Sequence, residues 1–213
     1  MGALILLIRH ATADYKPGRL YGWTPGVHLS ARGRDEAKRL AERLEVVRLK
    51  AVYSSPLERC LETAETVTAG RRLEVQVVEK LAEVRYGSWQ GRTFRSLMKT
   101  PLWRTVQLTP SQARFPGPEG ESIMELQRRG VDAIEELRTR HRTGVVAAFS
   151  HADTIKAILA HYLGMHLDLF QRIHVETASV SAIGFYGGFP RVSRIGDTGN
   201  YEVLNPPKPR RKK

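Results

Sequence analysis

Two short apolar runs that each lead into a histidine constrain the fold more than any other feature of this sequence. Residues 3–8 read ALILLI and run directly into Arg9 and His10, and residues 145–149 read VVAAF and end two positions before His151. Neither run alternates apolar with polar residues, which is typical of strands buried on both faces of a largely parallel sheet. Ligands bind beyond the carboxyl ends of such strands, so both histidines can face one site.

The rest of the chain alternates helical and extended patterns, which predicts an α/β fold. Apolar residues at helical spacing indicate helices beginning near residues 30, 55, 123 and 155, the last ending at Gly164. Strands are expected at residues 51–54, 75–78, 180–186 and 191–195. Ser55, Pro56 and Glu58 have the residue types of an N-cap, a first helical position and a capping box. Arg59 would then lie in the first turn of that helix.

At 213 residues the chain fits one domain, which we expect to span residues 1–204. Residues 86–122 are irregular, with four prolines and with large aromatic side chains that include Trp89, Phe94 and Trp103, and we expect them to form a cap over the site. The apolar run at residues 3–8 is far shorter than the roughly 18 residues that a membrane span needs. The single cysteine, Cys60, excludes an intrachain disulfide and agrees with a reducing compartment. We therefore expect a cytoplasmic protein without a membrane partner.

A basic tail at residues 205–213 carries much of the net charge. The formal charge is +12, and Lys208, Arg210, Arg211, Lys212 and Lys213 supply five of those twelve charges, which leaves +7 for the rest. Three prolines interrupt the tail and no aromatic residue offers a platform for base stacking, so we expect it to be disordered and solvated. An anchor for RNA or for an anionic surface is the alternative.

Arginine and glutamate residues beside the two histidines favour phosphoryl chemistry. Arg9 flanks His10, and Arg59 falls at a helix start, where free N–H groups already attract an anion. A guanidinium group binds two phosphoryl oxygens at once. Glu83 follows a predicted strand and can protonate a leaving oxygen. Taken singly, each residue has a plainer interpretation: structural histidines, a surface ion pair from Arg59 to a neighbouring glutamate, and a solvent-exposed Glu83.

Six segments resemble, in order, the motifs of the histidine phosphatase (phosphoglycerate mutase-like) superfamily. They read LLIRHATAD, YSSPLERCLETA, LAEVRYGSWQG, FPGPEGES, FSHADTIKAIL and TASVSAI, and they span residues 6–183. The stretch GRLYGWTPGVHLSARG most resembles a bacterial subgroup of phosphomutases and phosphatases. The resemblance implies a three-layer α/β/α sandwich with a mostly parallel central sheet.

The resemblance also implies roles for individual residues. His10 would be the nucleophile that carries the phosphoryl group, Arg9 and Arg59 would hold the phosphate, His151 would be a further donor to it, and Glu83 would be the proton donor. The substrate would be a small phosphorylated metabolite, with no metal and no other cofactor. A backbone carbonyl is expected to hold the second ring nitrogen of His10 and so fix its tautomer.

Three positions depart from the family pattern. Alanine replaces the usual glycine after each histidine, at Ala11 and Ala152, and Lys16 replaces a common asparagine. Lys16 can still contact phosphate as a point charge, so Lys16 and Ala152 are candidate substrate-binding residues.

Several alternatives stay open at this point. A phosphatase and a phosphoglycerate mutase-type phosphomutase share every residue named above and differ only in the group that accepts the phosphoryl unit. A metal-dependent phosphohydrolase would use His10, His151, Asp153 and Glu83, although two arginines would repel its cation. A catalytically weak protein on the same fold would bind RNA or a protein partner. The oligomeric state, a homodimer included, is not determined by the sequence.

Overall fold

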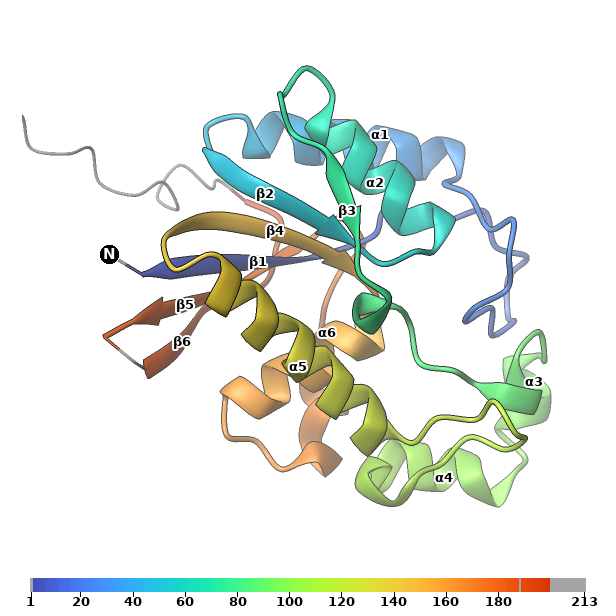
Figure 1. The fold of residues 1–213 in the computed structure, drawn as a ribbon. Coiled ribbons are helices and arrows are strands. Elements are labelled where there is room, and N and C mark those ends of the chain that lie inside the picture. Colours follow the sequence, from blue (N-terminus) through green and yellow to red (C-terminus); the bar gives the residue numbers. More distant parts are fainter. Residues whose placement is uncertain (1, 188, 200–213) are drawn as a thin grey trace, which may run out of the picture.

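One six-stranded sheet forms the centre of the protein. The structure is a computed structural model that describes residues 2–187 and 189–199. Its strands are β1 (Ala3–Arg9), β2 (Leu49–Ser54), β3 (Val75–Val77), β4 (Gly144–Ser150), β5 (Val180–Tyr186) and β6 (Phe189–Asp197). Their order across the sheet is β3-β2-β4-β1-β5-β6 (Figure 1). The first four in this order pair in parallel, whereas β5 and β6 add as antiparallel strands at one edge. The mostly parallel sheet is therefore confirmed.

Helices cover both faces of the sheet and make a three-layer sandwich. Helices α1 (Ala31–Leu44) and α2 (Glu58–Thr68) lie on one face, and α5 (Ile123–Arg140) and α6 (Ala152–Tyr162) lie on the other (Figure 1). Side chains of β1 alternate between the two cores: Leu6 and Ile8 pack with α1 and α2, whereas Ile5 and Leu7 pack with α5 and α6. This is why the apolar run of β1 has no polar alternation.

The helix start predicted at Ser55 and Pro56 is wrong by a few residues. Helix α2 begins at Glu58, its N-cap is Leu57, and no side chain caps it. The Oγ of Ser55 contacts His151 Nε2 at 2.8 Å instead, and the Glu58 carboxylate accepts a hydrogen bond from the backbone N–H of Gly26. Both side chains have hydrogen-bond partners that are distant along the chain, and rules for helix caps consider only neighbouring residues. The other predicted elements exist, with ends shifted by a few residues.

Residues 86–122 form short, irregular structure, as expected. They contain α3 (Phe94–Leu97), α4 (Pro101–Leu108) and two single 3₁₀ turns, Gly87–Trp89 and Pro110–Gln112. Further 3₁₀ turns lie at Glu79–Leu81 and Leu167–Arg172. Buried apolar side chains of this region join the core beneath α5 and α6, so it is packed onto the domain.

The tail predicted at residues 205–213 lies outside the described residues. Within residues 2–187 and 189–199, none of the helices combines the length and the apolarity that crossing a membrane requires.

Candidate active site

The adjacent parallel strands β1 and β4 bring the two histidines together. Arg9 pairs with Ser150 in the strand register, and the His10 backbone N–H donates to the Ser150 carbonyl at 3.0 Å. The ring centroids of His10 and His151 are 5.2 Å apart. Both side chains are buried, with 3% and 0% of their surfaces exposed. The two histidines thus lie at one place, at the ends of β1 and β4, as the two apolar runs predicted.

Arg59 joins the two imidazole rings. Its Nε donates to His10 Nε2 at 3.3 Å, and its Nη2 donates to His151 Nδ1 at 3.1 Å and to the Gly22 carbonyl at 2.9 Å. Only 1% of Arg59 is exposed, so the alternative of a surface ion pair with a neighbouring glutamate is wrong. Within the described part of the chain, the buried Nη1 of Arg59 has no hydrogen-bond partner. A buried cationic donor without a partner fits an anionic ligand.

The hydrogen bonds of His10 define which ring nitrogen is free to react. Its Nδ1 lies 2.7 Å from the Ala11 carbonyl oxygen, which can only accept, so the proton belongs on Nδ1. Nε2 then carries the lone pair, in agreement with its contact from the Arg59 donor. Burial and the positive charges of Arg59 and Arg9 hold the pKa of His10 well below its usual value. His10 is therefore a neutral imidazole with Nε2 turned toward the arginine.

Hydrogen bonds at both ring nitrogens also fix the orientation of His151. Its Nδ1 accepts from Arg59, so Nε2 carries the proton and donates to Ser55 Oγ. Burial, Arg59 and His10 hold the pKa of His151 well below its usual value. Cys60 Sγ lies 3.4 Å from the same Nε2, and burial raises the pKa of that thiol to about 12. His151 thus orients Arg59 in this structure.

Arg9 supplies a second guanidinium group to the site. Its Nη1 donates to the Val175 carbonyl at 2.7 Å, which fixes one end of the group. Among the residues that the structure describes, nothing accepts from its buried Nε. Two arginines from different elements therefore each present an unsatisfied donor.

Glu83 lies in the irregular segment that follows β3. Only 9% of it is exposed, and its Oε1 accepts from the Val84 backbone N–H at 3.0 Å. Burial, together with the nearby Asp153 carboxylate, raises the pKa of Glu83 to about 7. Burial acts in the same direction on Asp153, but the Lys156 ammonium 2.7 Å away, the Tyr86 hydrogen bond and the charge of Arg9 together lower the pKa of that carboxyl. Of the two carboxyl groups, Glu83 is the one that holds a proton near neutral pH.

A cavity of about 430 Å³ opens beside these groups. Arg9, Arg59, Glu83, Lys16 and Ala152 all line it, as do aromatic side chains from residues 86–122 and from the loop after β1. A second hollow, of about 600 Å³, lies against α5 and α6 and contains none of the sequence-predicted site residues. The cavity beside Glu83 is therefore the candidate substrate site.

The chain has clear relatives among known proteins. Its residues 5–198 match the histidine phosphatase superfamily (branch 1). It is 33% identical over 181 residues to phosphoserine phosphatase 1 of Hydrogenobacter thermophilus, covering 84% of this chain and 85% of that protein. It is 27% identical over 177 residues to the adenosylcobalamin/alpha-ribazole phosphatase of Escherichia coli, covering 83% and 87%. The solved structure of Bacillus stearothermophilus YhfR superposes with a TM-score of 0.86 at 29% identity, covering 92% of this chain and 98% of that one.

The chain belongs to the histidine phosphatase superfamily. In this histidine phosphatase, sequence reasoning missed several residues that the site contains. Tyr86 lines the cavity and donates to Asp153 Oδ2 at 3.1 Å, and Ser55 holds His151. Asp153 was considered only as a metal ligand of the alternative hydrolase, and its contact with Tyr86 was not predicted from the sequence. No sequence signal marks Ser55 as a histidine partner, since its residue type and position are those of a helix cap.

Proposed function

We propose that this histidine phosphatase is a phosphomonoesterase that hydrolyses a small phosphorylated metabolite through a phosphohistidine at His10. The observation that carries the proposal is the pair of contacts on the His10 ring. The Ala11 carbonyl fixes the proton on Nδ1, and Nε2 presents its lone pair beside a buried arginine that has a donor to spare. A neutral, oriented ring nitrogen next to an anion-binding group is what a phosphoryl-accepting nucleophile requires.

In the first step, Nε2 of His10 attacks phosphorus in line with the bond to the leaving oxygen. The N–P bond forms as the P–O bond breaks, and the unpaired donors of Arg9 and Arg59 stabilise the charge on the transferring group. One such well-placed donor contributes on the order of 2.7–4 kcal/mol to the transition state. The proton of Glu83 goes to the departing oxygen, so the product leaves as an alcohol.

In the second step, water attacks the phosphohistidine. Glu83, now a carboxylate, takes a proton from the water as the new P–O bond forms. The N–P bond breaks, its electron pair returns to Nε2, and inorganic phosphate leaves. A pKa of about 7 suits Glu83 for both directions of proton transfer at neutral pH.

His151, Lys16 and Ala152 have supporting roles in this proposal. Burial and the neighbouring positive charges depress the pKa of His151, and a bound phosphate dianion would counteract both, so that its Nδ1 can gain a proton and donate to the phosphoryl group. Lys16 and Ala152 line the cavity, which supports their proposed contact with the substrate. Residues 86–122 supply part of the cavity wall, and we assign them the role of a cap. A cytoplasmic location stays a prediction.

The same side chains would also serve a phosphomutase. The phosphatase is favoured because the Hydrogenobacter thermophilus and Escherichia coli relatives are named as phosphatases, and a mutase would need a second substrate hydroxyl to replace water. A metal-dependent hydrolase is disfavoured because Arg59 donates to the lone pairs of both imidazoles that would have to bind the cation.

The test is an activity screen over phosphate monoesters with the wild-type protein and the His10→Ala variant. Phosphoserine and α-ribazole phosphate belong in the panel, with 3-phosphoglycerate plus a bisphosphate primer to detect mutase turnover. We expect phosphate release by the wild type and a loss on the order of 10⁴-fold or more in the variant. His28→Ala, at an exposed histidine paired with Glu62, is the matched control and should keep full activity.

A phosphoenzyme that is labile to acid and stable to base should form rapidly with the wild type and be absent from His10→Ala. Turnover retained by a folded His10→Ala variant would refute the nucleophile. Turnover only in the presence of primer and 3-phosphoglycerate would assign the mutase instead.

A further inference from the structure

The segment that carries Glu83 has little regular secondary structure of its own. β3 ends at Val77, a single 3₁₀ turn occupies Glu79–Leu81, and residues 82–85 belong to no helix or strand. Buried backbone carbonyl and N–H groups need hydrogen-bond partners, and here no neighbouring strand supplies them. The position of Glu83 must therefore be set by side chains from elsewhere.

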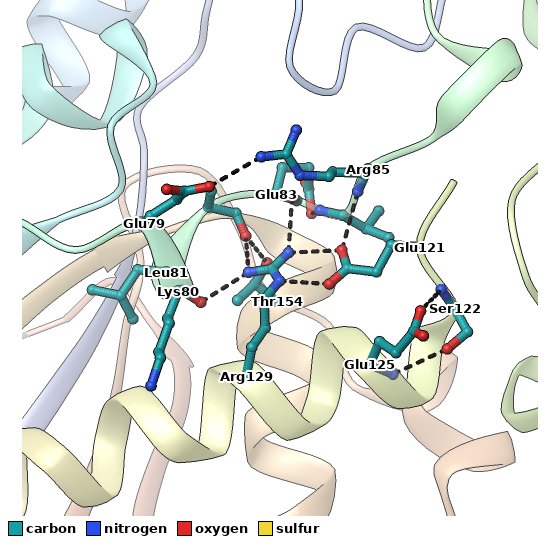
Figure 2. A network of polar contacts seen from close by, with 12 residues as sticks. Glu79, Lys80, Leu81, Glu83, Arg85, Glu121, Ser122, Glu125, Arg129 and Thr154 are labelled. Atoms are coloured by element: carbon teal, nitrogen blue, oxygen red, sulfur yellow. Dashed lines mark hydrogen bonds and ion pairs between the residues drawn. The ribbon is translucent and has the colours of Figure 1, made fainter. Parts of the chain in front are cut away.

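Arg129, in the middle of α5, provides most of those partners (Figure 2). Its Nη1 donates to the carbonyls of Lys80 and Ala82, each at 2.8 Å, and its Nη2 donates to the Glu83 carbonyl at 2.9 Å. One guanidinium group thus holds three carbonyls on the segment that leads into and includes the proposed acid. A lysine, with one nitrogen, cannot reproduce this spread of donors.

Glu121 completes the arrangement from the other side. Its carboxylate accepts from Arg129 Nε at 2.6 Å and from Arg129 Nη2 at 2.9 Å, which is a bidentate pair. The same carboxylate accepts from the Arg85 backbone N–H at 3.1 Å, and the Glu121 N–H donates to the Arg85 carbonyl at 2.9 Å. The backbone is consequently held on both sides of Glu83 (Figure 2).

The ion pair is sheltered, which makes it a firm support. The side chains of Arg129 and Glu121 are 21% and 10% exposed. The adjacent start of α5 is fixed by a capping box between Ser122 and Glu125. Thr154 and Trp23 add further donors, to the carbonyls of Ala82 and Glu83 respectively. Helix α5 therefore supplies most of the contacts that hold the segment of Glu83, and the sheet adds one, from Ser150 Oγ to the Leu81 carbonyl at 2.6 Å.

We propose that Arg129, paired with Glu121, is a positioning residue that places the Glu83 carboxyl for proton transfer to the leaving oxygen. This inference rests on the proposed function. Arg129 does not line the substrate cavity, so its effect must pass through Glu83. A general acid has to lie within hydrogen-bond distance of the oxygen that it protonates. Displacement of the segment would lose that geometry for Glu83, whereas the phosphate-binding side chains at the strand ends would stay in place.

Leaving-group dependence separates this role from a general structural one. The p-nitrophenolate anion leaves without a proton, whereas the alkoxide of phosphoserine needs one. The kinetic parameter kcat/KM covers the steps up to departure of the alcohol, so it reports on Glu83 as an acid and not on hydrolysis of the phosphohistidine. We expect Arg129→Lys to lower kcat/KM for phosphoserine by about 10-fold or more and for p-nitrophenyl phosphate by less than about 3-fold.

Further variants and measurements serve as controls for the comparison of phosphoserine with p-nitrophenyl phosphate. Glu121→Gln should show the same selective loss in weaker form, and Glu83→Gln should show it most strongly. Arg138→Ala, which removes a half-buried ion pair with Glu135 on the same helix, should change kcat/KM for neither ester. The inhibition constant of inorganic phosphate should stay within about 2-fold in Arg129→Lys, because the groups that bind phosphate are untouched. The basic limb of the phosphoserine pH profile should move to lower pH as Glu83 gains contact with water.

An equal loss on both esters, or no loss on either, would overturn the positioning role. If the wild type turns over no phosphate monoester of the panel, the proposed function fails, and positioning is then judged by NMR titration of the Glu83 carboxyl in folded protein. Arg129→Lys should move that titration downward toward the ordinary glutamate value of 4.5, and an unchanged titration would refute the inference.

Discussion

The two ends of the candidate active site are built by different means. The phosphate end consists of His10 and His151 at the ends of two paired strands, with Arg59 between them. The leaving-group end consists of Glu83 in a segment without regular structure, held by side chains of α5 and its approach. The first end depends on main-chain pairing in the sheet, and the second depends on a few charged side chains. Substitutions outside the cavity should therefore affect the second end more readily than the first.

The largest effect expected from this contrast is at Arg59. Arg59→Ala removes the donor to His10 and the unpaired buried donor together, so we expect kcat/KM to fall by about 10³-fold. Because phosphate binding is common to all substrates, phosphoserine and p-nitrophenyl phosphate should lose activity equally. Steady-state kinetics with both esters measure this. Arg32→Ala, at an exposed arginine, is the control, and a strongly unequal loss in Arg59→Ala would contradict the division into two ends.

A smaller and selective effect is expected at Glu83. The acid must be protonated to act, so kcat/KM for phosphoserine should fall as pH rises through about 7. Glu83→Gln should lower the plateau by about 10²-fold and remove that limb. With p-nitrophenyl phosphate the limb should be weak in both proteins. Initial rates from pH 5 to pH 9 provide the measurement, and a wild-type profile that stays flat above pH 7 would argue against Glu83 as the acid.

The raised pKa of Glu83 also predicts a pH-dependent stability difference. The carboxyl ionises near 4.5 in the unfolded chain and near 7 in the folded protein, so the wild type loses stability as pH rises across that window. Glu83→Gln has no such ionisation. Relative to wild type, its free energy of unfolding should gain on the order of 1–3 kcal/mol between pH 4.5 and pH 8. Urea denaturation at both pH values tests the sign, and a gain in the opposite direction would show that Glu83 is ionised in the folded protein.

The smallest effect is expected in the cavity wall. Trp103 on α4 lines the cavity and packs against Trp89 and Phe94, with ring centroids 6.4 and 6.1 Å away. Trp103→Ala should raise KM by about 3-fold to 10-fold for the preferred metabolite and leave kcat within about 2-fold. Leu108→Ala, at an exposed position near the end of the same helix, should change neither parameter. A large fall in kcat for Trp103→Ala would instead connect the wall to the chemistry.

The same contrast explains what the sequence could and could not predict. Buried strands have a strong apolar signal, so the sheet, the placement of His10 beside His151 and the helices α1 and α5 could be predicted. Arg59 could be placed at the start of a helix, but its contacts with both histidines depend on packing between strands far apart in the sequence. Ser55 was misinterpreted as a cap because its partner, His151, is distant along the chain. The support of Glu83 by Arg129 left no local pattern at all, since carbonyl groups are present at every residue.

The placement of β1 next to β4 has a consequence for biosynthesis. The proposed nucleophile His10 follows β1 and is synthesised well before the neighbouring strand β4, and β5 on the other side of β1 is synthesised later still. Pairing of such distant segments is a slow event, and it requires that the chain has been synthesised at least through β4. Nascent chains that stop before β4 should therefore be inert toward phosphate esters, and the cell would not encounter a partly made enzyme that already cleaves its metabolites.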